Sequence, residues 1–217
     1  MKRILEIDAL RGLALVSMVL FHAAMIAGIF ELADFDLYSG VWRVLARLTQ
    51  YVFLGLLGVS LVLSSRDYFG QVKRAVKILL LAFLPTIATF LLFGDEFVRF
   101  GILHFAAVAI LLVRPFKGHA WFAIVAAVLV LLLKDWFFES IFFVLFYSPW
   151  DYFPLFPWLA VPLLGLAFAE FFGKRFSADF SCLSKLPILV WMGQRSLWIY
   201  LIHFPVLYVL FFLISKV

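Results

Sequence analysis

The chain has 217 residues, of which 66% are hydrophobic and only 14% are charged. An average soluble domain is roughly 45–50% apolar and about 25% charged, so a soluble enzyme, a nucleic-acid-binding module and a disordered tail are excluded. The net charge of +5 then fits the excess of Lys and Arg in cytoplasmic loops of membrane proteins better than it fits nucleic-acid binding. The composition predicts an all-α, multi-pass integral protein of the cell membrane, with no nucleic acid among its partners.

Seven apolar stretches predict a polytopic bundle of about seven transmembrane helices. A helix needs about 20 apolar residues to cross the hydrocarbon core, and the fourth and fifth stretches are short. The stretch 136–147 is also apolar, but Glu139 and Ser140 interrupt it, so we predict a re-entrant or interfacial segment there. Because no linker or internal repeat is detectable, residues 1–217 are expected to form a single domain. The seven predicted spans lie near residues 12–30, 48–64, 76–94, 100–114, 119–134, 156–173 and 188–214.

The distribution of basic residues predicts how these spans are oriented. With the N-terminus inside and seven crossings, thirteen of the eighteen Lys and Arg residues fall in inner segments. Since cytoplasmic loops carry the excess of basic residues, an N-in, C-out orientation is predicted. The loop between the second and third spans is densely basic and contains Arg66, Lys73 and Arg74. Contact with anionic lipids is one explanation of this cluster, and a site for a phosphorylated cytosolic cofactor is the other.

Ionisable side chains inside predicted spans are costly in a bilayer, so each is a candidate functional residue. Arg11 and His22 share one face of the first span, about 16 Å apart along the axis, and Asp8 is spaced to pair with Arg11. His104 begins the fourth span and His203 lies in the seventh. Neutral imidazoles can act as bases or nucleophiles. The alternatives are a snorkelling anchor for Arg11 and histidines that only hydrogen-bond between helices. No metal site is expected, because no two histidines have i,i+4 spacing.

The outer connection near residues 135–156 is rich in Trp, Tyr and Phe. This composition is typical of an aromatic belt at the membrane interface, and a lid or stacking platform over an outward-facing pocket is the alternative. Asp151 lies in this connection and is predicted to face outward. There it would orient a histidine or bind an amine, unless it is simply a solvated loop end.

Four sequence blocks together resemble the catalytic-domain family of heparan-α-glucosaminide N-acetyltransferase. They read EIDALRG at 6–12, FGILH at 100–104, DYFPLFPW at 151–158 and GQRSLWIYLIHFP at 193–205. In this order and spacing the blocks cover nearly the whole chain. The spacing of Arg11 and His22 also resembles the first-helix motif of transmembrane acyltransferases that modify bacterial polysaccharides.

The resemblance implies a membrane-embedded acyltransferase. Its donor would be cytosolic acetyl-coenzyme A, and its acceptor an amino sugar or similar glycan group at the outer face. His22 would be the base or a transient acetyl carrier. The other catalytic candidates, for orientation, oxyanion donation or amine binding, are His104, His203 and Asp151. The residues implied to hold the coenzyme A phosphates are Arg11, Arg66, Lys73 and Arg74.

Two other function classes stay open on the sequence, namely a small-solute transporter and a non-catalytic membrane scaffold. Many transporters are built from inverted repeats, and this chain has no detectable repeat. Binding and turnover of acetyl-coenzyme A would separate the three classes. Besides the coenzyme A thioester and the acceptor, membrane lipids are expected partners, and a homo-oligomer stays open.

Overall fold

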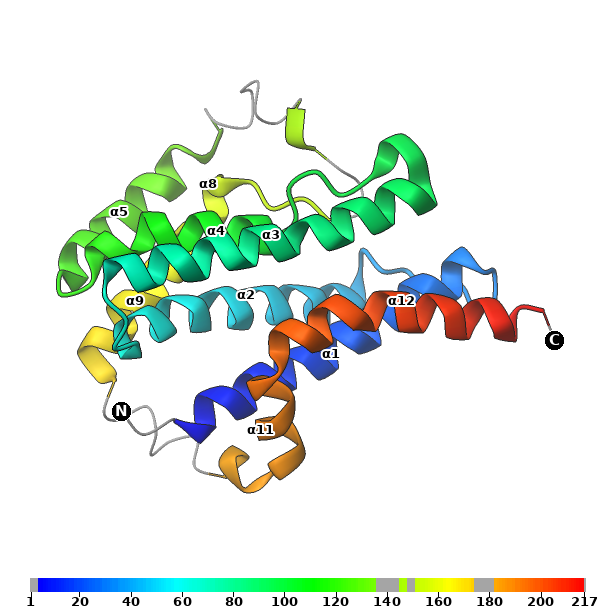
Figure 1. Cartoon of the computed structure of the whole chain (residues 1–217), viewed down its shortest axis with the longest axis horizontal. Coiled ribbons are helices and arrows are strands. Elements are labelled where there is room, and N and C mark those ends of the chain that lie inside the picture. Colours follow the sequence, from blue (N-terminus) through cyan, green and yellow to red (C-terminus); the bar gives the residue numbers. More distant parts are fainter. Residues whose placement is uncertain (1–3, 136–144, 148–150, 174–181, 217) are drawn as a thin grey trace. The chain divides into compact units, whose positions relative to one another are not determined.

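The computed structural model describes residues 4–135, 145–147, 151–173 and 182–216, and all regular structure in these ranges is helical. Most of the predicted segment 136–147 lies outside the described residues. The chain forms two compact units (Figure 1), which we call unit 1 (residues 1–53 and 174–217) and unit 2 (residues 54–173). The expectation of a single domain over 1–217 stays a prediction.

The predicted apolar stretches all correspond to helices. Within the described ranges, five helices are long and apolar enough to cross a membrane, and two shorter apolar helices accompany them. The all-helical class is therefore confirmed, while the number of crossings stays a prediction. The main helices are α1 (Leu5–Ile29), α2 (Gly40–Leu63), α3 (Tyr68–Phe93), α4 (Ile102–Val113), α5 (Ala120–Leu132), α8 (Leu155–Trp158), α9 (Ala160–Phe172), α11 (Pro187–Gln194) and α12 (Ser196–Ile214).

Four predicted boundaries were wrong, among them the start of α3, which is Tyr68 rather than a residue near 76. The first helix begins at Leu5 rather than near residue 12, because acidic side chains in its first turn complement the helix dipole. The second begins at Gly40 rather than near residue 48. The predicted span 188–214 is two helices, because Arg195 between α11 and α12 has non-helical torsions (φ −109°, ψ 18°).

Unit 1 is built around α1, which packs against α11 and α12 (Figure 1). Two glycines permit the close contact with α11. A Cβ at Gly12 would overlap the carbonyl oxygen of Leu189, and a Cβ at Gly193 would overlap that of Asp8. Such close backbone approach at small residues is typical of helix packing in membranes.

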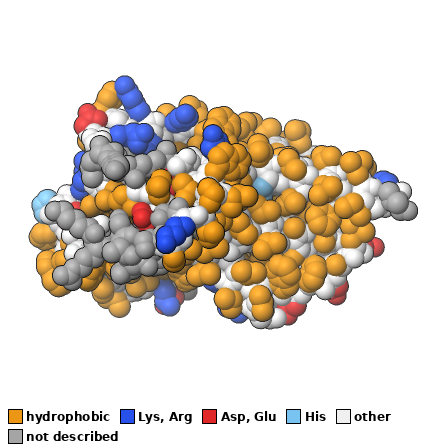
Figure 2. Space-filling model, turned by 90° about the horizontal axis from the view of Figure 1, so that it is seen from below, with side chains coloured by type: hydrophobic (Ala, Val, Ile, Leu, Met, Phe, Trp, Pro, Cys, Tyr) orange, Lys and Arg blue, Asp and Glu red, His pale blue; other side chains and the backbone are white. Residues whose placement is uncertain are grey.

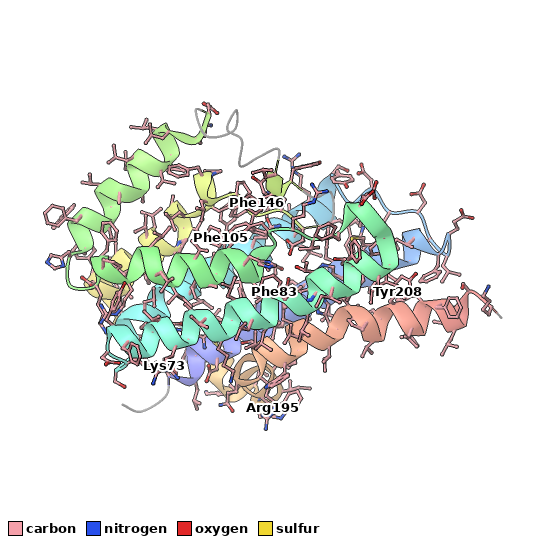
Figure 3. All side chains as sticks on the ribbon, turned by 45° about the horizontal axis from the view of Figure 1, so that its top comes forward. Lys73, Phe83, Phe105, Phe146, Arg195 and Tyr208 are labelled. Carbon is pink, nitrogen blue, oxygen red and sulfur yellow. The ribbon has the colours of Figure 1, made fainter. Side chains whose placement is uncertain are left out.

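Helices α1 and α12 run in the same direction. The His22 ring lies 4.8 Å from the His203 ring, and further along both helices the Phe30 ring lies 5.1 Å from that of Tyr208. Figure 3 shows Arg195 and Tyr208 on successive parts of the C-terminal segment. The start of α1 and the end of α12 therefore lie at opposite ends of unit 1.

In unit 2, α3 and α4 form an antiparallel pair and α5 packs against α9. The antiparallel pair buries Phe105 completely, and the Phe83 ring of α3 faces α4 (Figure 3). The part of α2 that belongs to this unit crosses α9 at glycines. A Cβ at Gly58 would overlap the carbonyl oxygen of Pro162.

The chain exposes apolar side chains and buries polar ones. Hydrophobic side chains cover most of the face shown in Figure 2. On α12 the one buried side chain is His203, and the buried residues of α3 include Gln71 and Thr89. The core itself is mostly hydrophobic, but so many large apolar side chains are also exposed that the surface is the one expected of helices surrounded by lipid.

Candidate active site

The N-terminal end of α1 in unit 1 carries the predicted ion pair. Arg11 Nη1 lies 3.1 Å from Asp8 Oδ1, with the Asp8 side chain buried and the Arg11 side chain partly exposed. Both residues lie in the first two turns of α1, and Gly193 of α11 packs against the Asp8 backbone. The Arg11 guanidinium is thus held at the contact between α1 and α11, because its buried carboxylate partner restricts the conformations of the Arg11 side chain.

Further along α1, the structure brings His22 into contact with His203. The Nδ1 atom of His22 lies 2.9 Å from the carbonyl oxygen of Met18 and 3.3 Å from Nε2 of His203. On the other ring, Nδ1 of His203 lies 2.6 Å from the carbonyl oxygen of Tyr200. The sequence placed both histidines within spans but did not predict this pair.

His104 lies in unit 2, at the beginning of α4. The backbone N–H of Gly101 donates to His104 Nδ1 at 3.3 Å, so this nitrogen carries a lone pair and the ring proton lies on Nε2. The rings of Phe83 and Phe100 flank the imidazole, with centroids 5.7 and 5.8 Å from its own. His104 therefore holds an N–H donor in a buried, aromatic setting.

Asp151, which precedes α8 and is distant in the sequence, contacts the same end of α4. Its Oδ2 atom accepts a hydrogen bond of 3.1 Å from the backbone N–H of Ile102, one of the free donors at the helix N-terminus. A Cβ at position 101 would overlap this carboxylate, so only glycine admits it. Asp151 is thus positioned as a cap of α4, one turn from His104. That role is more specific than the solvated loop end considered from the sequence.

The opposite end of unit 2 is basic, and hydrogen bonds tie together two connections and the end of α9 there. Lys117, between α4 and α5, donates to the carbonyl oxygen of Ser64 at 2.8 Å, and the N–H of Gly118 donates to the carboxylate of Glu170. Burial lowers the pKa of the Lys117 ammonium, the neighbouring Arg114 guanidinium lowers it further, and Glu170 opposes the shift. Lys117 was not among the predicted site residues, although its place in an inner loop could have indicated it.

The basic residues of unit 2 that are predicted to bind the coenzyme A phosphates lie just before α3 or in its first turns. Asp67 caps this helix by accepting from the N–H of Gly70 at 2.8 Å, which orders the loop beside it. Arg66 is exposed, and the Lys73 ammonium lies 4.6 Å from the centroid of the Phe69 ring. Figure 3 shows Lys73 on the first turns of α3. Within the described ranges, neither Arg66 nor Lys73 is ion-paired with a carboxylate, so both are available to an anion.

The predicted site residues therefore fall into two groups, one in each unit. Unit 1 holds Arg11, His22 and His203. Unit 2 holds His104 and Asp151 at the start of α4, and it also holds Arg66, just before α3, with Lys73 and Arg74 in the second turn of α3 rather than in the predicted loop. Among the described residues, no three His, Cys, Asp or Glu side chains are grouped as metal ligands.

Apolar helices with buried ionisable side chains define a membrane protein with candidate functional residues inside its helices. The chain belongs to the family described as heparan-alpha-glucosaminide N-acetyltransferase, catalytic, whose model matches residues 3–205. This match spans all four sequence blocks and confirms the resemblance. At the level of the family, the chain is a membrane acetyltransferase. Neither a curated protein nor a solved structure gives a significant match.

Proposed function

We propose that this chain is an acetyl-coenzyme A-dependent transmembrane acetyltransferase of the cell membrane. It moves an acetyl group from the cytosolic donor to an amino sugar or similar glycan group at the outer face. The observation that carries the proposal is a repeated spacing of a cation and a histidine along a helix. Arg11 and His22 lie about 16 Å apart along α1, and Arg114 and His104 lie about 15 Å apart along α4. A thioester with phosphates at one end and its acetyl group at the other needs anchors spaced in this way.

Each unit contains basic residues of the kind that bind the phosphates of such a donor. Phosphates are bound by Arg and Lys through charge-assisted hydrogen bonds, and Arg66 and Lys73 have no described carboxylate partner to displace. Arg74 and Arg11 complete the proposed set, with the Asp8 carboxylate holding Arg11 in position. When bound, acetyl-coenzyme A supplies an acetyl group already activated as a thioester.

The histidines fit the requirements of the transfer itself. An amine or hydroxyl acceptor must lose a proton, and we assign its removal to His22 as general base. The thioester carbonyl oxygen gains negative charge in the transition state, which an aligned N–H donor stabilises. In unit 2, the Nε2–H group of His104 is a donor of this kind, and Asp151 holds the end of α4 from which His104 projects.

The orientation that this scheme requires is N-in, C-out. The parallel course of α1 and α12 supports it, because an odd number of crossings places the two termini on opposite sides. Cysteine labelling from each side is the measurement, with the exposed native Cys182 first replaced by Ser. Cysteines at positions 2 and 74 should react from inside and a cysteine at 151 from outside. Labelling of position 74 from outside would contradict the orientation.

The experiment that tests the function uses purified protein in lipid nanodiscs with radiolabelled acetyl-coenzyme A. The wild type should bind coenzyme A and transfer the acetyl group to an amino sugar. His22→Ala should lose about 10²–10⁴-fold in transfer rate at saturating donor, since a general base typically contributes that factor, while coenzyme A binding is retained.

The matched control is His119→Ala, because His119 is exposed and lies outside both groups of site residues. It should transfer like the wild type. Equal transfer rates for His22→Ala and the wild type would remove His22 from the mechanism. Absence of coenzyme A binding by the wild type would overturn the enzyme in favour of a transporter or scaffold.

A further inference from the structure

We infer that His203 is a positioning residue that holds the ring proton of His22 on Nδ1 and thereby leaves Nε2 of His22 as the basic nitrogen. The catalytic consequence rests on the proposed function, whereas the proton position rests on hydrogen-bond geometry alone. Both rings belong to unit 1, one on α1 and one on α12.

The first half of the argument concerns His22. Its Nδ1 atom lies 2.9 Å from the carbonyl oxygen of Met18. A carbonyl oxygen only accepts hydrogen bonds, so Nδ1 must carry the proton. Nδ1 therefore faces His203 as a donor too, and Nε2 of His203, at 3.3 Å, has to be the acceptor.

The second half starts independently from His203. Its Nδ1 atom lies 2.6 Å from the carbonyl oxygen of Tyr200 and must likewise carry a proton. A neutral imidazole has one N–H, so Nε2 of His203 holds a lone pair. The two halves agree on the acceptor. The reverse assignment would place a lone pair of His22 against the Met18 carbonyl and require both nitrogens of His203 to be protonated.

Burial makes this arrangement rigid. His203 is the only buried side chain of α12, and the rings of Phe21 and Phe204 approach His22 edge-on with centroids 5.7 and 6.1 Å from its own. A buried nitrogen without a partner costs free energy, so the two facing nitrogens hold each other in place. No described residue hydrogen-bonds to Nε2 of His22, and this nitrogen keeps its lone pair for an acceptor.

The proton balance of the transfer follows from this assignment. Nε2 of His22 takes the proton of the acceptor as the acceptor nitrogen or oxygen forms its bond to the acetyl carbon. The carbon–sulfur bond of the thioester breaks, and the thiolate receives the proton from Nε2. In between, the doubly protonated ring of His22 donates from Nδ1 to Met18 and to His203, which stabilises its charge.

The direct test is nitrogen NMR of the full chain labelled with ¹⁵N-histidine. The sequence contains only four histidines, so single substitutions assign every ring. The wild type should show His22 protonated at Nδ1 and bare at Nε2, with a scalar coupling across the hydrogen bond to Nε2 of His203. In His203→Phe the His22 ring should become a mixture of tautomers. A wild-type His22 with its proton on Nε2 would overturn the inference.

A second test uses two carboxamides that imitate different nitrogens of His203. In His203→Gln the side-chain oxygen reaches the place of Nε2 and can still accept from His22. In His203→Asn the side chain reaches only the place of Nδ1. We expect His203→Gln to transfer within about tenfold of the wild type and His203→Asn to lose about 10²-fold or more, with coenzyme A binding unchanged in both.

These experiments distinguish a failure of the positioning role of His203 from a failure of the proposed base role of His22. Equal losses in the two carboxamide variants, with intact folding by NMR, would overturn the positioning role of His203. A full transfer rate in His22→Ala, with the His22 proton still on Nδ1 in the wild type, would instead remove the proposed function of His22 and leave the hydrogen-bond assignment standing.

Discussion

The two units hold their histidines with the ring proton on opposite nitrogens. In unit 1, Nδ1 of both His22 and His203 faces a backbone carbonyl and carries the proton. In unit 2, Nδ1 of His104 accepts from the backbone N–H of Gly101, and the proton lies on Nε2. The same residue type is therefore prepared as a base in one unit and as a donor in the other.

The position of each histidine within its helix explains the difference. His22 and His203 lie inside long helices, where the backbone groups within reach of Nδ1 are carbonyls of the preceding turn. His104 lies in the first turn of α4, where backbone N–H groups have no partner within the helix. The first turn supplies a donor to Nδ1 and the helix interior supplies an acceptor, so the local backbone favours one tautomer in each place, and for His22 the inferred contact with His203 reinforces it.

The largest expected effect is on the transfer rate of two His104 variants, which test the tautomer assigned to His104. Removal of one oxyanion donor typically costs about 10²–10³-fold in rate. His104→Asn can still accept from Gly101 but has no donor at the place of Nε2, so it should lose that factor. His104→Gln places an amide N–H there and should keep much of the rate. Transfer assays at saturating donor compare the two, and a smaller loss in His104→Asn than in His104→Gln would contradict the assigned tautomer.

The next effect concerns the helix crossing that supports the histidine pair of unit 1. Gly12→Ala puts a methyl group into the Leu189 backbone and should lower the free energy of unfolding by about 1–3 kcal/mol. Gly28→Ala on the same helix meets only an ordinary contact and should be neutral or stabilising by up to about 1 kcal/mol. Thermal unfolding in nanodiscs measures both, and destabilisation by Gly28→Ala alone would contradict the crossing.

The crossing of α2 and α9 in unit 2 allows the same test of helix packing in the second unit. Gly58→Ala should also be destabilising by about 1–3 kcal/mol, because its methyl group meets the Pro162 backbone. Gly55→Ala, one turn earlier on α2, meets nothing within contact distance and serves as the control. Hydrogen exchange resolved by peptide should show local loosening around α9 for Gly58→Ala only. If it also loosened α1, the division into units would not describe the energetics.

A smaller effect is expected at the cap of α4. Asp151→Ala removes the acceptor of the Ile102 N–H and should cost about 0.5–2 kcal/mol. Asp151→Asn keeps an acceptor and loses the charge that favours a helix N-terminus, so it should cost about 0.3–1 kcal/mol. Unfolding midpoints rank the two variants, and equal stability of all three proteins would show that the cap contributes nothing measurable.

The smallest effect is a pH dependence in the turn between α1 and α2. Hydrogen bonds from the Ser39 hydroxyl and the Tyr38 N–H lower the pKa of the exposed Asp36 below its usual 3.8. A lowered carboxyl pKa adds stability above the ordinary pKa, and this contribution is lost as the pH falls through the lowered value. Amide exchange at Tyr38 should therefore be better protected at neutral pH than below pH about 3. In Asp36→Asn that difference should vanish.

Local sequence patterns were enough to predict much of the fold and part of the candidate site. The apolar stretches predicted every described long helix, because lipid exposure makes hydropathy a local property of each segment. The spacing of Asp8 and Arg11 predicted their ion pair, since residues three apart meet on one helix face. The four sequence blocks predicted the family. Helix ends were the weak point, because the charged first turn of α1 lies outside the apolar stretch from which the span was predicted.

The tertiary structure alone decided which side chains meet. His22 and His203 are 181 residues apart, and periodicity assigns each to a face of its own helix without saying which helices touch. The cap of α4 by Asp151 likewise depends on a contact with distant backbone. Those contacts exist because Gly12, Gly101 and Gly193 leave room that any other residue would fill. Close packing of this kind is a property of two segments together, so the sequence of either one does not specify it.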